Sequence, residues 1–345
     1  MSDATVVGLA GLMERWRRPV AFALAFIAVI AILGSFWMSI SDAPKVAADA
    51  YTYLAAGERL NAGHHLYELH AGDRWIWINP PFWTVPLLSP PLIGVLWRPL
   101  AALPSDSGLL LWQVLTIGTI GATVAALIVR LPIRASLLAI ALAVPIGFEI
   151  DVANVNGLLL GGYVLSWWLF VRHRNEVGLV VAAMALVKIA PVVLAWWLFT
   201  QRRWRAVAWF VGGALLLLMV GILGSSLEMH LRYLSIATQT VSGGNSNLSL
   251  AGVASALGVP PSIAASLPKL ALVAGAISIW LLRKRPGPAF AVAIVTAIFG
   301  SPVVNFNTLA LLMATLAPLA WPIREPTTDQ PADGRPVPLP STGGV

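Results

Sequence analysis

Residues 20–40 contain no charged side chain, and this run is about as long as the ~20 residues that a helix needs to cross the hydrocarbon core of a bilayer. Comparable apolar runs follow at 109–129, 158–170 and 263–282. Of the 345 residues, 58% are hydrophobic and 11% are charged, whereas a soluble protein carries about 25% charged residues. The chain is therefore expected to fold as a polytopic bundle of transmembrane helices.

The basic residues gather in short clusters between the apolar runs. The formal net charge of +7 would fit a nucleic-acid-binding protein if the cations covered one face, but apolar runs separate them. Such clusters are typical of cytoplasmic loops under the positive-inside rule. They occur at residues 15–18, 130–134, 172–174, 202–205 and 283–285. We therefore expect both termini in the cytoplasm and no nucleic-acid partner.

Placing every cluster on the inner side predicts an all-α fold with roughly ten spanning or half-spanning segments. The acid-rich residues 41–80 then form an outer loop after the first span. If residues 82–103 and 109–129 both crossed the membrane, the cluster at 130–134 would lie outside, against the positive-inside rule. Residues 82–103 are interrupted by a Pro-Pro pair, and we expect them to be re-entrant.

Three regions follow from this topology. Residues 1–19 form a cytoplasmic N-terminus without the cleavage pattern of a secretory signal, so the first span is expected to remain in the protein. Residues 20–323 form the membrane-embedded domain, with 41–80 as its outer loop. Residues 324–345, rich in proline and glycine, are expected to be a disordered cytoplasmic tail.

Asp49 stands a few residues after the first apolar run, where a carboxylate at the membrane face can remain ionised and still reach a lipid-borne substrate. One hypothesis is that it acts as a general base and takes the proton from an attacking sugar hydroxyl. The alternatives are a helix N-cap and a solvated loop acid.

Lys188 lies within the apolar segment 177–200, which begins and ends at inner clusters and is therefore expected to be a hairpin bent near Lys188 and Pro191. A lysine at the centre of a membrane helix costs about 2.5–3.5 kcal/mol on insertion scales, so it is usually functional. A lipid phosphate is the natural partner. An interior carboxylate, a helix carbonyl and snorkelling to the inner face are the alternatives.

Asn154 and Asn156 precede an apolar span, where they either bind a polar head group or cap the helix. His64, His65 and His70 lie in one loop, but their spacing is a weak indication of a metal site. We therefore predict no metal site, and the sequence does not firmly predict any cofactor. Cysteine is absent, which excludes disulfides and thiolate chemistry.

An ordered series of short motifs runs along nearly the whole chain. It comprises D-x-x-x-Y at 49–53, L-Y-E at 66–68, P-P at 80–81, N-x-N at 154–156, A-x-x-L-V-K-I-A-P at 183–191, N-x-S-L at 247–250 and S-P at 301–302. This succession resembles the GT-C type glycosyltransferases of family 87, which are polyprenyl-phosphate-mannose-dependent α-1,2-mannosyltransferases.

The resemblance implies roles for particular residues. It makes Asp49 the catalytic base, and it assigns the donor or substrate to Tyr53, Asn154, Asn156, Lys188, Asn247 and Asn307. The chain departs from the family pattern at two places. Asn79 precedes the Pro-Pro pair where the family usually has tyrosine, and Asn305 and Asn307 replace the aromatic residue and the histidine that usually follow the late Ser-Pro. Asn307 can donate a hydrogen bond but cannot carry a proton or a positive charge.

The predicted function is an integral membrane glycosyltransferase of the bacterial inner membrane, with its active site outside the cytoplasm. It would move a sugar, with mannose as the expected one, from a polyprenyl-phosphate donor to a lipid or glycan acceptor, with inversion. The rival hypotheses are a lipid or solute transporter and a non-catalytic lipid-glycan binding protein. No internal repeat in hydropathy, as many transporters have, is evident in the sequence.

Overall fold

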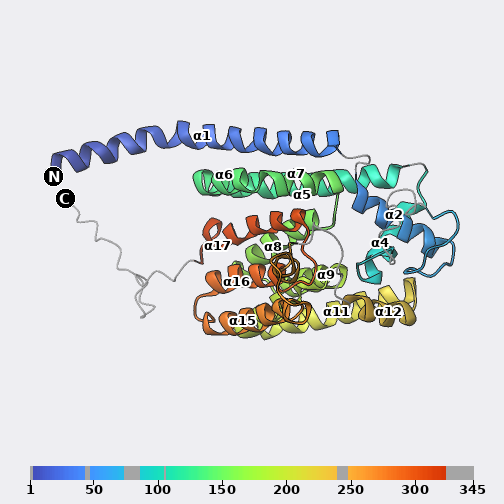
Figure 1. The fold of residues 1–345 in the computed structure, drawn as a ribbon. Coiled ribbons are helices and arrows are strands. Elements are labelled where there is room, and N and C mark those ends of the chain that lie inside the picture. The colour runs from blue at the N-terminus through green and yellow to red at the C-terminus, as the bar shows by residue number, and fades with distance from the viewer. Residues whose placement is uncertain (1–2, 43–46, 74–85, 105, 239–247, 324–345) are drawn as a thin grey trace, which may run out of the picture.

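The computed structural model describes residues 3–42, 47–73, 86–104, 106–238 and 248–323 (Figure 1). These residues form helices and connecting turns without a β-strand, so the all-α prediction is confirmed. The helices are α1 (Asp3–Asp42), α2 (Ala48–Asn61), α4 (Pro91–Ala101), α5 (Ser107–Arg130), α6 (Pro132–Ala141), α7 (Ala143–Val152), α8 (Asn156–Val171), α9 (Val177–Val187), η1 (Ala190–Val192), α10 (Val193–Thr200), α11 (Trp204–Gly224), α12 (Leu227–Thr238), α13 (Leu250–Ala256), α14 (Pro261–Ala264), α15 (Leu267–Leu281), α16 (Pro286–Phe299), η2 (Phe306–Leu316) and α17 (Ala317–Ala320).

Four helical stretches of the described chain are long and apolar enough to cross a membrane. They are Trp16–Ser41, Ser107–Arg130, Trp204–Gly224 and Pro261–Leu281. The pair α6 and α7, bent by 67°, makes a fifth if it counts as one span. Five more apolar helices have 10–17 residues and are too short to cross alone, since a crossing needs about 20. The protein is thus a membrane protein, and the total of ten segments stays a prediction.

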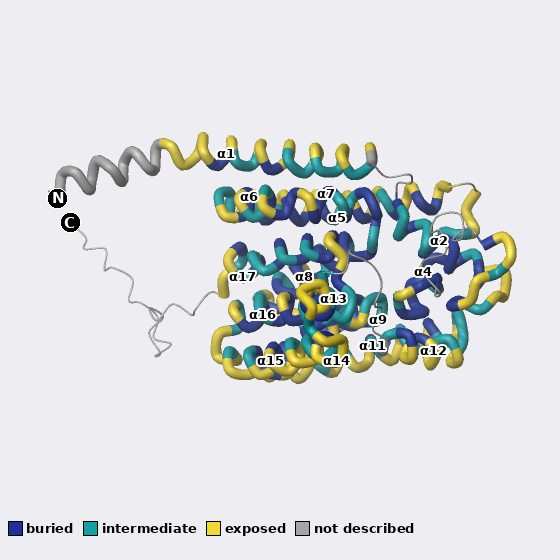
Figure 2. Tube along the Cα trace, viewed as in Figure 1, coloured by how far each residue is buried: buried dark blue, intermediate teal, exposed yellow. Residues whose placement is uncertain are grey.

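Helix α1 lies along the outside of the bundle against α6 and α7, with its outer side exposed (Figures 1 and 2). Gly147 of α7 makes this approach possible, because a Cβ at that position would collide with Ser35 and with the backbone of Phe36. Near the end of α1, Ser39 Oγ donates a hydrogen bond to Asp151 Oδ2. The last turns of α1 therefore meet the end of α7.

The segment 177–200 folds back on itself, as expected for a hairpin. Its two ends lie close together: the guanidinium of Arg203, which follows the segment, is 2.9 Å from Nδ1 of His173, which precedes it. The same guanidinium contacts the Phe170 carbonyl. Its two arms are α9 and α10. Its tip is the extended Lys188 followed by η1, where Pro191 interrupts the α-helical hydrogen bonding. We call this the first hairpin.

A second hairpin runs from α16 through η2 to α17, with its tip at 300–305. Its two ends lie together beside the first hairpin. The Pro286 carbonyl at the start of α16 accepts from Trp197 Nε1 of α10, and the Trp321 carbonyl after α17 accepts from Trp167 Nε1 of α8. The Arg130 guanidinium stacks over the Trp321 ring.

The basic clusters therefore share one end of the bundle, which we call the basic end. It carries Arg130, Arg134, residues 172–174, 202–205 and 283–285. In Figure 1 this is the left end, where α1 begins and where α6 and α17 lie. The hairpin tips point to the opposite end, which we call the site end.

The site end continues into a cap formed by α2, α4, α12 and residues 62–73. Arg59 is buried and binds Asp73 and the Leu66 carbonyl, which fixes the loop onto α2. Helix α4 has 11 residues and packs on α2, so it is too short to cross the membrane alone, and the re-entrant course of 82–103 stays a prediction.

Several predictions fall on residues outside the described ranges. They concern Asn247, the Asn79-Pro80-Pro81 motif, part of the 41–80 loop and the tail 324–345.

Candidate active site

Asp49 lies in the first turn of α2, at the junction between the cap and the bundle. Ala47, two residues before it, turns the chain sharply because its backbone is left-handed, with φ 61°. The Ala47 N–H donates to the Asp151 carbonyl at 2.7 Å. This bond ties the start of α2 to the end of α7. The side chain of Asp49 is half-buried and so remains partly accessible.

Asn154 connects Asp49 with the start of α8. It follows Ala153, whose left-handed φ of 50° ends α7. The Asn154 amide Nδ2 donates to Asp49 Oδ2 at 2.7 Å, and its Oδ1 accepts from the Asn156 backbone N–H at 3.0 Å. Asn154 thus accepts a hydrogen bond from the first N–H of α8, although Val155 is the N-cap residue, and it also holds the Asp49 carboxylate.

Glu149 lies beneath this turn and is almost fully buried, at 1% exposure. Both of its oxygens are used: Oε1 accepts from the Gly157 N–H at 2.8 Å, and Oε2 accepts from the amides of Asn307 and Asn156 at 2.7 and 3.3 Å. The carboxylate faces the N-terminus of α8, where a helix dipole favours negative charge. Three donors and this dipole are what a buried carboxylate requires.

Lys188 completes the network from the tip of the first hairpin. Its ammonium Nζ donates to Asn156 Oδ1 at 2.7 Å. A continuous chain of hydrogen bonds therefore runs from Asp49 through Asn154 and Asn156 to Lys188. Of the structural alternatives for Lys188, snorkelling to the basic end is wrong, because the lysine is at the opposite end of its hairpin.

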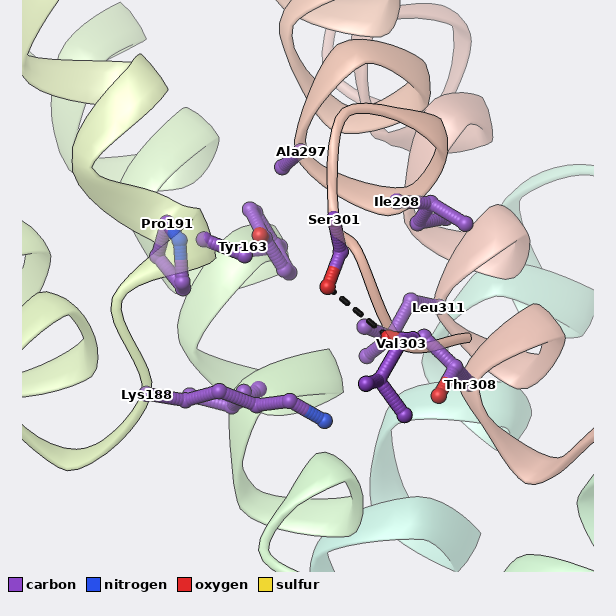
Figure 3. Close-up of a pocket in the computed structure, with 11 residues that line it drawn as sticks. Tyr163, Lys188, Pro191, Ala297, Ile298, Ser301, Val303, Thr308 and Leu311 are labelled. Carbon is purple, nitrogen blue, oxygen red and sulfur yellow. Dashed lines mark hydrogen bonds between the residues drawn. The ribbon is translucent and has the colours of Figure 1, made fainter. Parts of the chain in front are cut away.

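A small pocket lies between the two hairpin tips and α8 (Figure 3). Lys188 enters it from one side, and the loop with Ser301 and Val303 closes the other. Tyr163 and Thr308 add further polar groups to a wall that is otherwise apolar. The pocket therefore combines the ammonium group of Lys188, the last residue of the hydrogen-bond chain from Asp49, with several hydroxyl groups.

Tyr53 lies one helical turn after Asp49 on α2 and is buried against Trp97 and Trp112. Burial raises the pKa of its phenol well above 10, and the carboxylates of Asp49 and Glu149 raise it further. Tyr53 is thus a neutral, aromatic wall beside Asp49.

Asn307 is buried at 1% exposure and contacts Glu149. Its Oδ1 has no hydrogen-bond partner among the described residues, and it does not line the pocket. Asn305 is exposed. Asn247 is outside the described residues, but the next residue, Leu248, donates its N–H to the Val304 carbonyl at the tip of the second hairpin.

Burial also acts on Asp49. It raises the pKa of this carboxyl above its usual value of 3.8, while the hydrogen bond from Asn154 and the positive charge of Lys188 act in the opposite direction. An aspartate with a raised pKa is a stronger base once it is ionised. Within the described residues only Oδ2 accepts a hydrogen bond, which leaves Oδ1 for a substrate proton.

Sequence reasoning did not single out Glu149. The sequence did contain a signal for it: Glu149 lies near the end of an apolar stretch, where inserting a charged side chain into the membrane costs as much free energy as inserting Lys188.

The histidines of the cap do not form a metal site. His64 and His70 stack with ring centroids 4.3 Å apart, and the described residues contain no group of three acidic or histidine side chains suited to a metal ion.

The model of glycosyltransferase family 87 matches residues 77–322. This range includes Glu149, Lys188 and the amides between them, whereas Asp49 and Tyr53 lie before its start. The curated proteins and the solved structures gave no significant match. Since the matched range exceeds half of the chain, this membrane protein belongs to glycosyltransferase family 87 and is a glycosyltransferase.

Proposed function

We propose that the protein transfers mannose from a polyprenyl-phosphate donor to a hydroxyl of a lipid or glycan acceptor, with inversion at the anomeric carbon. Asp49 is the general base and Lys188 neutralises the leaving phosphate. One observation carries this proposal: a single chain of amides joins the carboxylate of Asp49 to the ammonium of Lys188. A proton acceptor and a phosphate partner are thereby held in one fixed arrangement.

The reaction balances with these two groups. The acceptor oxygen forms a bond to the anomeric carbon while its proton moves to Asp49 Oδ1. The bond from the anomeric carbon to the phosphate oxygen breaks on the opposite face, and its electron pair stays on that oxygen. The donor phosphodiester becomes a phosphomonoester and gains negative charge, which the Lys188 ammonium offsets.

The pocket supports the same placement of the donor. The pocket has a cavity volume of only about 10 Å³, which is room for about one water molecule, so the hairpin tips must move apart before a phosphate can lie beside Lys188. The hydroxyl groups of Tyr163 and Thr308 would then lie along the wall, whereas Ser301 Oγ already donates to the Val303 carbonyl. The three site amides of Asn154, Asn156 and Asn307 then position charged side chains and are not themselves proton carriers.

We propose that the site end faces the outside of the bacterial inner membrane. The support is the single basic end, which the positive-inside rule places in the cytoplasm. Donor and acceptor would then meet on the outer side, where Asp49 lies at the junction of cap and bundle.

The test is a transfer assay with purified, detergent-solubilised protein. Polyprenyl-phosphate-mannose radiolabelled in the sugar is incubated with a panel of lipid and glycan acceptors, and polyprenyl-phosphate-glucose serves as the second donor. We expect labelled product with the mannose donor, and the anomeric configuration by NMR reports inversion. Glu68→Gln is a matched control, because Glu68 is an exposed acid of the same cap.

Each rival function has its own outcome in this experiment. Donor binding without product for any acceptor would indicate a binding protein, consistent with the absence of a titratable group at Asn307. Movement of labelled donor between the leaflets of proteoliposomes, without transfer, would indicate a transporter.

A further inference from the structure

The basic end carries a concave pocket that the proposed transfer reaction does not use. It lies between the C-terminal ends of α10 and α15 and is lined by Thr200, Gln201, Arg202, Arg283 and Lys284. Three of these five residues are cations, and the lining contains no carboxylate. We propose that this pocket binds the phosphate headgroup of an anionic phospholipid from the leaflet at the basic end.

The charge of the pocket is not neutralised by the protein. In the part of the chain that the structure describes, no carboxylate forms an ion pair with Arg202, Arg283 or Lys284. All three are exposed. Three uncompensated cations around one hollow repel one another, and an anion between them removes that repulsion. A phosphate group accepts hydrogen bonds from several donors at once and fits this arrangement.

A second observation points to a ligand with hydrogen-bond acceptors. The amide Nε2 of Gln201 is buried and has no hydrogen-bond partner among the described residues. A buried donor without an acceptor is unfavourable, and most such groups are satisfied in the complete system. Because Nε2 is closed off from the surface, an oxygen of a bound headgroup would satisfy it once the Gln201 side chain turns into the pocket.

The surface next to the pocket is aromatic and partly exposed, which separates a lipid from a soluble anion. Trp196 of α10 and Trp280 of α15 stack with centroids 6.2 Å apart, and Phe199 stacks on Trp196. These rings are 37–43% exposed. Tryptophan typically lies at the boundary between headgroups and acyl chains. A phosphate in the pocket would place acyl chains along these rings.

The position of the pocket also distinguishes it from the candidate active site. Helix α10 connects it with η1 and Lys188, and α16 connects Arg285 with the loop at Ser301. The two sites thus lie at opposite ends of the same two hairpin arms. Basic pockets between transmembrane helices on the cytoplasmic side commonly bind anionic headgroups.

The experiment is a lipid titration of the full-length protein in detergent, followed by native mass spectrometry. The probes are short-chain phosphatidylglycerol, short-chain phosphatidylcholine and inorganic phosphate. We expect phosphatidylglycerol to bind most tightly and inorganic phosphate not to displace it at equal concentration. Arg202→Gln, Arg283→Gln and Lys284→Gln should each weaken binding about fivefold, the size expected for one cation near an anionic headgroup.

Arg172→Gln is the matched control. Arg172 is also exposed at the basic end and also stacks on a tryptophan, with its guanidinium 4.1 Å from the Trp168 ring centroid, but it does not line the pocket. It should leave binding unchanged. Equal binding of phosphatidylcholine, or an equal loss in Arg172→Gln, would overturn a specific site. Displacement by inorganic phosphate would overturn the lipid as its ligand.

Discussion

The two ends of the bundle handle charge in opposite ways. At the site end, the charged groups of Asp49, Glu149 and Lys188 are at least half-buried and bind amides and not one another. At the basic end, exposed guanidinium groups lie over aromatic rings, as Arg172 does over Trp168 and Arg283 over Trp280. At the site end the protein itself fixes the position of each charged group, whereas at the basic end the charged groups remain open to water or to a ligand.

Replacing Asp49 tests the site end most directly. Asp49→Asn keeps the shape of the side chain but cannot accept the acceptor proton, so transfer should fall by about 10²–10⁴-fold, the scale of general-base catalysis. The measurement is kcat with radiolabelled donor, with thermal unfolding as the check on folding. Turnover close to that of the unchanged protein would remove Asp49 as the base.

Replacing Lys188 tests whether its charge acts on the donor. Lys188→Met keeps length and apolar fit, and it should lower kcat about 100-fold and weaken donor binding, because the charge on the departing phosphate is then uncompensated. Lys188→Arg should recover only part, since a planar guanidinium does not reproduce a compact ammonium. Donor and acceptor are varied separately. An effect on acceptor KM alone would contradict the assignment.

Glu149→Gln tests whether the buried network supports the fold. The NH₂ group of the new glutamine would face the NH₂ groups of Asn156 and Asn307, which then lose their hydrogen-bond acceptor. The free energy of unfolding should therefore fall by about 1–3 kcal/mol. Thermal unfolding in detergent measures this. The double variant Glu149→Gln with Asn307→Asp restores one donor and acceptor pair and should recover part of the loss. A fully stable single variant would show that the bonds to Glu149 are dispensable.

A pH profile sharpens the electrostatic side of the comparison. Burial raises the pKa of Asp49 above 3.8, so kcat/KM should fall as the pH drops through that raised value and the base becomes protonated. The hydrogen bond from Asn154 favours the ionised form. Asn154→Ala should therefore move the acid limb to higher pH, whereas Glu68→Gln should not move it. A shift to lower pH would contradict the proposed role.

Labelling of single introduced cysteines tests which end of the bundle faces outward. The cysteine substitutions themselves should have little effect on transfer activity. The chain has no cysteine, so each introduced thiol is the only one. Ala71→Cys in the cap should react with an impermeant maleimide in intact cells, and Arg174→Cys at the basic end should react only after permeabilisation. The reverse pattern would invert the orientation and place the candidate active site in the cytoplasm.

Much of the architecture could be predicted from hydropathy and charge. The hairpin with its bend at Lys188 and Pro191 followed from two basic clusters that had to share one side. The same rule predicted that 82–103 does not cross as a full span, and α4 within it is too short to cross alone. The number of complete crossings did not follow, because five apolar helices are shorter than a span and pair through tertiary contacts.

The site was only partly predictable. Asp49, Asn154, Asn156 and Lys188 were named from the sequence and lie in one network. The hydrogen bonds between them were not predictable from the sequence. They depend on the left-handed backbone of Ala153, which turns the chain so that the start of α8 lies over Glu149. Asn307 was expected near the donor, which stays a prediction; in the structure it is buried and donates to Glu149. Its partner is 158 positions earlier, and no local pattern reports such a pair.

That separation has a consequence for biosynthesis. Ribosomes add about 5–20 residues per second, so Asn307 is made roughly 8–30 s after Glu149. During this interval the nascent chain already holds a carboxylate in an apolar helix without its last amide donor. The unfinished protein must keep Glu149 hydrated, protonated or sheltered by the insertion machinery until the second hairpin arrives.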